Sequence, residues 1–145
     1  MIAIVNMQRQ VRIPRKMLTE IATKIMRGEK KSGDVSFVFV DNTEIHRLNR
    51  QYLNHDWDTD VISFLLRDDT NPGDQTLGEV VISAQKAAQE ARRRSIATRT
   101  ELLLYAVHGL LHLCGYDDGK PADIARMRAR EIHYMKKILP NYRPL

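Results

Sequence analysis

The segment from Glu101 to Tyr116, ELLLYAVHGLLHLCGY, constrains the fold of this chain more than any other stretch of its sequence. It is long enough for about four turns of α-helix, and nearly all of its side chains are apolar. A helix that is apolar on most sides is stable only when the rest of the protein covers it. The segment therefore predicts a buried central helix. Thr98 and Glu101 have the spacing of a capping box at its start, and Gly115 is placed to end it.

The flanking sequence predicts the elements that cover this helix. Four stretches are rich in β-branched and aromatic residues and predict strands: IAIVNM, VSFVFV, VISFLL and LGEVVIS. Further helices are predicted from Pro14, after Asp41, after Ser83, and from Pro121 through about Leu139. A chain of 145 residues is enough for one core. We therefore expect one α+β domain, residues 1–145, with a small mixed sheet of about four strands and about five helices.

The composition excludes several classes of protein. No apolar run approaches the roughly 20 residues that a membrane-spanning helix needs. The N-terminal MIAIVNMQRQ has too short an apolar run for a signal peptide and is predicted to form a strand. The one cysteine, Cys114, forms no internal disulfide, which suits a reducing compartment. We therefore expect a cytoplasmic protein with no membrane partner.

The positive charge is unevenly distributed. The chain has 23 Lys and Arg against 18 Asp and Glu, and residues 119–145 hold seven of the basic residues and only two of the acidic ones. The first 118 residues are therefore balanced, although Arg92, Arg93 and Arg94 form a local basic cluster. Basic clusters attract phosphate backbones, but they are also common on solvated helix faces. Charge alone favours the solvated face.

Two histidines lie within the predicted central helix. His108 and His112 are four residues apart, so their imidazoles lie on one side of a helix and can face one metal ion. Gly115 would turn the chain back so that a nearby carboxylate reaches the same ion, and its spacing favours Asp118 over Asp117. Two histidines and one carboxylate, with a fourth position for water, are the ligands of a catalytic zinc ion. The alternative is two core histidines that are satisfied separately.

The spacing H-x-x-x-H-x-x-G-x-x-D is similar to that of zinc proteases, with one difference that matters. Those proteases carry a glutamate directly after the first histidine as the general base, and this chain has Gly109 there. Peptide hydrolysis would lack its proton acceptor, which argues against a protease. Cys114 points to the far side of the helix and is predicted to belong to the core.

The sequence HGLLHLCGYDD, from His108 to Asp118, resembles the signature of the YbeY family of bacterial endoribonucleases, H-G-x-L-H-L-x-G-Y-D-H. It differs at the last position alone. Upstream, LNRQY followed by TDVISF resembles the family block L-N-x-x-[YF]-R with T-D-V-L-S-F, and LGEVVIS resembles L-G-D-I-x-I-S. The order and spacing of these blocks agree from about residue 35 to residue 118.

The resemblance implies a metal-dependent endoribonuclease that acts on single-stranded RNA in the maturation of small-subunit ribosomal RNA and in ribosome quality control. It implies one zinc ion, held at the catalytic centre by His108, His112 and Asp118. Ribosomal RNA and the ribosome would be the partners. In such a site Asp60 or Asp117 could orient a ligand imidazole, although Asp60 could equally be an ordinary loop cap. The RNA backbone would be held by basic residues, for which the candidates are Arg50, Arg92, Arg93, Arg94, Arg126 and Arg130.

Two departures from the family pattern bear on activity. Asp118 stands where the family has its third histidine. A carboxylate binds zinc at about the same distance, but its charge makes the ion a weaker Lewis acid and favours harder ions such as Mn²⁺ or Mg²⁺. Leu53 stands where the family has an arginine expected to face the phosphate, and Arg50 or His55 are possible substitutes. A metal-, RNA- or ribosome-binding protein that does not cut RNA, and a hydrolase of another substrate, therefore stay open as alternatives.

The loop NHDWDTD, residues 54–60, contains further candidates. His55, Asp56 and Asp58 are potential ligands of a second metal ion, although such residues are usually solvated in loops. Trp57 can stack on a base or pack the loop onto the domain, and packing is the simpler interpretation.

Overall fold

The computed structural model describes residues 1–53 and 60–144, apart from the side chain of Leu53. The described residues form nine elements, in the order predicted from the sequence: β1 (Ile2–Asn6), α1 (Arg15–Gly28), β2 (Asp34–Val40), α2 (Asn42–Leu53), β3 (Val61–Leu65), β4 (Thr76–Ser83), α3 (Ala84–Arg94), α4 (Thr98–Leu113) and α5 (Pro121–Ile138). The predicted α+β class is confirmed.

The four strands form one mixed sheet in the order β1-β2-β4-β3. β1 and β4 both run parallel to β2, whereas β3 runs antiparallel to β4 and forms an edge of the sheet. Successive side chains of a strand point to opposite faces. Phe37, Phe39 and Val80 therefore join the main core, while Val81 packs in a smaller cluster with Ile45 of α2.

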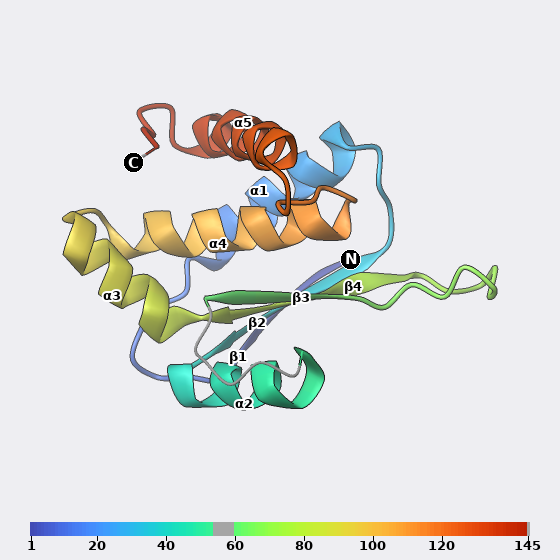
Figure 1. The fold of residues 1–145 in the computed structure, drawn as a ribbon, viewed down its shortest axis with the longest axis horizontal. Coiled ribbons are helices and arrows are strands. Elements are labelled where there is room, and N and C mark those ends of the chain that lie inside the picture. Colours follow the sequence, from blue (N-terminus) through green and yellow to red (C-terminus); the bar gives the residue numbers. More distant parts are fainter. Residues whose placement is uncertain (54–59, 145) are drawn as a thin grey trace.

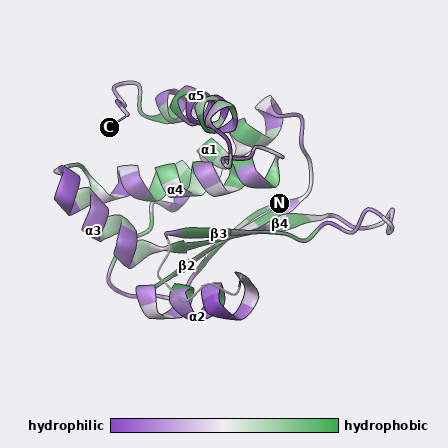
Figure 2. Cartoon of the chain, in the orientation of Figure 1, coloured by the Kyte–Doolittle hydropathy of each residue, from purple (hydrophilic) through white to green (hydrophobic). Residues whose placement is uncertain are grey.

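The helices cover both faces of this sheet (Figure 1). α2 lies on one face, α1 and α4 lie on the other, and α5 forms an outer layer over α1 and α4. Ten of the 16 residues of α4 are buried, which confirms the predicted central helix. In Figure 2 the sheet is mainly hydrophobic, whereas α2 and α3 carry broad hydrophilic surfaces. In the part of the chain that the structure describes, no helix has both the length and the apolar character that a membrane crossing requires.

The ends of α4 differ from one another. At its C-terminus Gly115 has φ +105°, and the Gly115 and Tyr116 amides donate to the carbonyls of His112 and Leu111. This is the Schellman motif, which the glycine predicts. The capping box predicted at the N-terminus is wrong, since Ala97 is the N-cap and no side chain caps the helix. Glu101 is instead buried, with its Oε1 3.3 Å from Arg94 Nη1.

The side chains of Asp41 and Ser83 cap their helices as predicted. The Asp41 carboxylate accepts a hydrogen bond from the Glu44 amide, and the Ser83 hydroxyl accepts one from the Lys86 amide. Short polar side chains satisfy the first free amides of a helix in this way. Asp41 directly follows β2 and Ser83 is the last residue of β4, so the sheet determines where α2 and α3 begin.

Glu29, just after α1, connects the end of α1 to α5 and to the turn that follows α4. Its carboxylate accepts hydrogen bonds from Arg130 and Tyr134 of α5 and from the hydroxyl of Tyr116. Burial raises the pKa of Glu29, but the hydrogen bonds from Tyr134, Arg130 and Tyr116 outweigh it, and the pKa lies below its ordinary value. The network fastens α5 and the turn after α4 onto α1.

Candidate metal centre

His108, His112 and Asp118 come together at one end of α4. The Nε2 atoms of the two histidines are 3.2 Å apart, and each lies 3.4 Å from Oδ2 of Asp118. The helical spacing brings the imidazoles together, and the turn at Gly115 returns the chain to them. Asp117 does not join them: its carboxylate accepts a hydrogen bond from the Asp118 amide.

The spacing of these three atoms fits a small tetrahedral metal ion. Zinc lies about 2.0–2.1 Å from nitrogen and oxygen ligands, and tetrahedral angles then place ligand atoms about 3.3 Å apart. The three observed separations, 3.2, 3.4 and 3.4 Å, agree with this value. Two imidazoles and one carboxylate are also a ligand set that zinc accepts. The residues present therefore fit a zinc ion.

Each imidazole has its second nitrogen engaged by a hydrogen-bond partner. Nδ1 of His108 lies 2.6 Å from Oε1 of Glu131 on α5, and Nδ1 of His112 lies 3.0 Å from the backbone oxygen of Tyr116. Both partners are acceptors, so each Nδ1 carries the proton and each Nε2 presents its lone pair to the cluster. Glu131 and the Tyr116 carbonyl thus have the orienting role that was expected of Asp60 or Asp117.

Negative charge gathers around His108. Burial alone would lower the pKa of His108, but the hydrogen bond to Glu131 and the charges of Glu131 and Asp118 outweigh it and raise the pKa. The same carboxylates would stabilise a bound cation. Because a proton and a metal ion compete for Nε2, metal binding at this site should weaken as the pH falls.

Gly109 explains why the protease glutamate is missing here. A β-carbon at position 109 would lie 2.4 Å from Cγ1 of Val80, so only glycine allows α4 to approach the sheet so closely. The Ser63 hydroxyl of β3 donates a 2.8 Å hydrogen bond to the Gly109 carbonyl. Position 109 therefore faces the sheet instead of the metal ligands, which agrees with the predicted exclusion of a protease.

The cluster opens to solvent beside the edge strand. The side chains of His108, His112 and Asp118 are 29%, 27% and 46% exposed. They line a pocket of about 380 Å³ together with residues of β3 and with Asp60, which precedes that strand. Water and a flexible polymer can reach ligands that are exposed to this degree.

Three of the predicted RNA-binding arginines, on α3, have different surroundings. Arg93 pairs with Glu90 at 2.7 Å, and Arg94 bridges Glu90 and the buried Glu101. Arg92 lines a separate pocket near the start of α1, with Arg12 and other basic residues. The structure therefore divides this run between two surfaces.

The other three predicted RNA-binding arginines are widely spread. Arg130 is occupied by Glu29, with Nη2 2.6 Å from Oε2, and its guanidinium lies 5.0 Å from the ring centre of Tyr134. Arg126 is exposed, with Nη1 3.7 Å from Asp123. Arg50 is exposed in the last turn of α2, on the other face of the sheet from α4. RNA binding by all six arginines stays a prediction.

Cys114 packs against the main core, as predicted. Burial raises the pKa of its thiol to about 11, which keeps the thiol protonated and unsuited to metal binding at neutral pH. The residues considered as ligands of a second metal ion, His55, Asp56 and Asp58, lie outside the described residues, and so does Trp57. So does the side chain of Leu53.

Sequence reasoning missed Glu131 and Ser63. Glu131 lies 23 residues from His108 in the chain, on a helix whose sequence is mostly basic. No local spacing connects it to the histidines. The one available signal was an acidic residue on the side of the last helix that faces the core. That signal would not have shown that Glu131 contacts His108.

Together the fold and the cluster define a small α+β protein in which two histidines and one carboxylate, beside the edge of its sheet, could hold a metal ion. The family model described as "Endoribonuclease YbeY" matches residues 3–139. The chain therefore belongs to the YbeY endoribonuclease family, and this membership supports a hydrolytic nuclease.

Individual relatives agree with this assignment. The chain is 38% identical over 143 residues to the endoribonuclease YbeY of Syntrophotalea carbinolica, covering 95% of both chains. It is 41% identical over 111 residues to that of Salinibacter ruber, covering 73% of this chain and 71% of the relative. The solution structure of TM1509 from Thermotoga maritima matches with a TM-score of 0.67 and 26% identity, over 97% of this chain and 90% of that one.

Proposed function

We propose that this protein is a zinc-dependent endoribonuclease that cuts single-stranded segments of the small-subunit ribosomal RNA precursor in the cytoplasm. Ribosome quality control and contact with the ribosome are part of the proposal. Family membership supports the nuclease. One observation carries the metal dependence: the ligand atoms of His108, His112 and Asp118 lie 3.2–3.4 Å apart, which is the spacing that a tetrahedral ion needs.

Different residues would bind the metal ion at this centre and orient its ligands. A zinc ion held there would act as a Lewis acid. It would lower the pKa of a water molecule toward neutrality and stabilise negative charge on a phosphodiester. His108 and His112 present their Nε2 lone pairs, and Asp118 presents a carboxylate oxygen. Glu131 and the Tyr116 carbonyl hold the protons on the two Nδ1 atoms, which prevents the imidazoles from turning away.

Asp118 sets the metal preference of the proposed site. A carboxylate in place of the family's third histidine adds a negative charge to the metal site. A bound ion would then lower the pKa of a bound water molecule less strongly. The carboxylate also makes Mn²⁺ or Mg²⁺ more competitive with zinc. Activity measured with each of the three ions, after removal of bound metal, identifies the one that the site uses.

A second candidate function is a family member that binds metal and RNA, or the ribosome, without cutting. The departures at Asp118 and Leu53 favour it, because both positions belong to the proposed reaction centre while the scaffold motifs are kept. RNA binding without chelator-sensitive cleavage is the result that would select it.

The test is cleavage of labelled single-stranded and structured RNA, with and without a chelator, by the wild type and by His112→Ala. We expect cleavage of the single-stranded RNA that the chelator stops and that His112→Ala lacks. His133→Ala is the matched control, since His133 is exposed on α5. Cleavage that survives both the chelator and His112→Ala would come from a contaminant and would contradict the proposal.

A further inference from the structure

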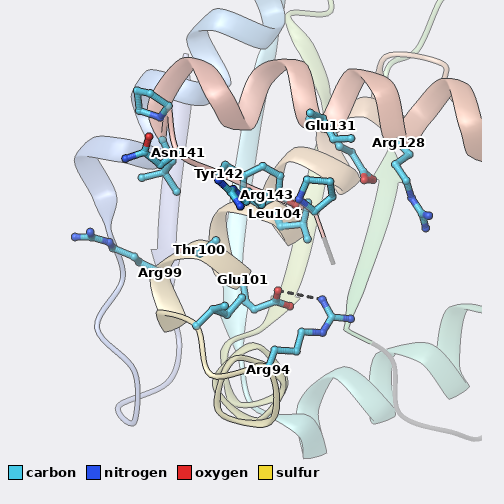
Figure 3. Close-up of a pocket in the computed structure, with 15 residues that line it drawn as sticks. Arg94, Arg99, Thr100, Glu101, Leu104, Arg128, Glu131, Asn141, Tyr142 and Arg143 are labelled. Atoms are coloured by element: carbon cyan, nitrogen blue, oxygen red, sulfur yellow. Dashed lines mark hydrogen bonds and ion pairs between the residues drawn. The ribbon is translucent and has the colours of Figure 1, made fainter.

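A pocket of about 640 Å³ lies beside the metal centre, between α4, α5 and the C-terminal tail (Figure 3). α5 runs above it and the end of α3 lies below it in this view. Its volume is in the range of small-molecule sites. The metal ligands do not line it, so the proposed reaction does not account for it.

The rim of this pocket is rich in arginine. Arg94, Arg99, Arg128 and Arg143 line it, against two carboxylates, Glu101 and Glu131. Both carboxylates have partners, because Glu101 pairs with Arg94 and Glu131 holds His108. Arg99, Arg128 and Arg143 are all exposed. Among the described residues, no carboxylate oxygen lies within 4.0 Å of any of these three guanidinium groups. The rim therefore has an excess of positive charge that suits an anion.

The floor of the pocket is apolar. It is formed by side chains of the turn between α3 and α4, of α4, of α5 and of the tail, with the half-buried ring of Tyr142 among them: Ile96, Leu104, Ile132, Leu139 and Tyr142. An apolar floor under a cationic rim matches the two parts of a nucleotide, which are a flat base and a charged phosphate. Bases that are free of a duplex bind to such surfaces by stacking and apolar contact.

A third cavity lies between this pocket and the metal centre. It has a volume of about 340 Å³ and shares Arg94, Glu101, Leu104, Arg128 and Glu131 with the larger pocket. It shares Asp60, Val61 and His108 with the pocket that holds the metal ligands. The three cavities therefore lie in a row, so a strand whose phosphate lies at the metal centre could extend past Glu131 and Arg128 toward the basic pocket.

We propose that this basic pocket binds nucleotides of the single-stranded RNA that flank the phosphodiester at the metal centre. Arg128 and Arg143 contact the phosphates, and the apolar floor holds an unstacked base. This inference rests on the proposed nuclease function and deepens it, because it assigns the path of the substrate. It adds Arg128 and Arg143 to the six predicted RNA-binding arginines, of which Arg94 also lines this pocket.

The test is equilibrium binding of a fluorescent single-stranded RNA of about 12 nucleotides, measured by anisotropy in a chelator over a series of salt concentrations. The chelator makes the result independent of metal binding and cleavage. For Arg128→Glu combined with Arg143→Glu we expect at least about tenfold weaker binding. The salt slope should be smaller by about 1.4, because each phosphate that the protein no longer neutralises lowers it by about 0.7. Arg128→Lys with Arg143→Lys should keep the slope.

Two controls make the outcome decisive. Lys24→Glu with Arg27→Glu changes the charge by the same amount on exposed residues of α1, outside the pocket, and should bind like the wild type. Arg12→Glu with Lys16→Glu tests the neighbouring basic pocket near the start of α1, which shares only Arg99 with the proposed one. Wild-type affinity in the Arg128 and Arg143 variant overturns the proposal, as does a loss confined to the Arg12 and Lys16 variant. Equal affinity for a duplex of the same sequence also overturns it. A chain that binds as expected but does not cut contradicts the nuclease function and leaves the pocket intact.

Discussion

The two histidines of the metal centre are held in place in different ways. The partner of His112 is the backbone carbonyl of Tyr116, four residues along the chain and fixed by the turn at Gly115. The partner of His108 is Glu131, which comes from a different helix. That helix is fastened to α1 through Glu29. One side of the centre therefore depends on local backbone geometry and the other on the docking of α5, so the two sides can be perturbed separately.

The largest expected effect comes from removing the ligand that both sides share. Asp118→Ala should weaken zinc binding by at least about 100-fold. Structural zinc sites bind the ion with about 10–16 kcal/mol shared among four ligands, so the loss of one ligand removes a large part of the binding free energy. Zinc affinity is measured by competition with a chromophoric chelator, with Asp117→Ala as the neighbouring control. Equal zinc content in Asp118→Ala and the wild type would show that Asp118 is not a ligand.

The next effect is specific to the His108 side. Glu131→Gln keeps a hydrogen-bond acceptor and removes the charge, and we expect about tenfold weaker zinc binding, at the lower end of the roughly 10–100-fold range for residues that orient metal ligands. Glu131→Ala, which also removes the hydrogen-bond acceptor, should weaken zinc binding by an amount toward the upper end of that range. Asp123→Asn removes the same charge from α5 without contact to His108 and is the control. Unchanged affinity in Glu131→Ala would mean that the orientation of His108 does not depend on α5.

The Glu29 network should contribute to stability in a pH-dependent way. Its lowered pKa means that the ionised form is stabilised in the folded state. The contribution is therefore complete above the ordinary glutamate pKa of 4.5 and is lost as the pH falls through the lower folded value. We expect Glu29→Gln to cost about 1.5–3 kcal/mol at neutral pH.

Urea unfolding of the wild type and of Glu29→Gln between neutral and acidic pH measures this difference. The gap between the two proteins should narrow as the pH falls below 4.5. Glu20→Gln is the control, because Glu20 is exposed on α1, the helix that Glu29 follows. A gap that stays constant, or widens in acid, would contradict the assignment to the Glu29 charge.

On the His112 side a modest loss of stability is expected. Gly115→Ala places a β-carbon at φ +105°, which L-residues adopt with strain, and should cost about 1–2 kcal/mol of stability. No atom would clash with that β-carbon, so the cost is conformational. Gly119→Ala, where the backbone is unstrained, is the matched control. Thermal unfolding of the two variants is the measurement, and equal melting temperatures would show that the turn tolerates a side chain.

Much of the fold could be predicted because its signals are local. The apolar run of α4 and the strand segments are visible in short windows of sequence, and so are the caps at Asp41 and Ser83. The capping box at Thr98 failed because Glu101 forms a tertiary ion pair with Arg94 and is buried. A spacing rule for helix starts contains no information about the neighbouring helix.

The sequence indicated His108 and His112 through their four-residue spacing, and the turn expected at Gly115 favoured Asp118 over Asp117 as the third candidate ligand. The tertiary structure alone decided which groups orient those ligands and where a strand of RNA could lie. Glu131 reaches His108, and Arg128 and Arg143 reach the basic pocket, because α5 and the tail pack over α4. Contacts of this kind depend on how helices pack, and residues far apart in the chain leave no spacing from which such packing can be predicted.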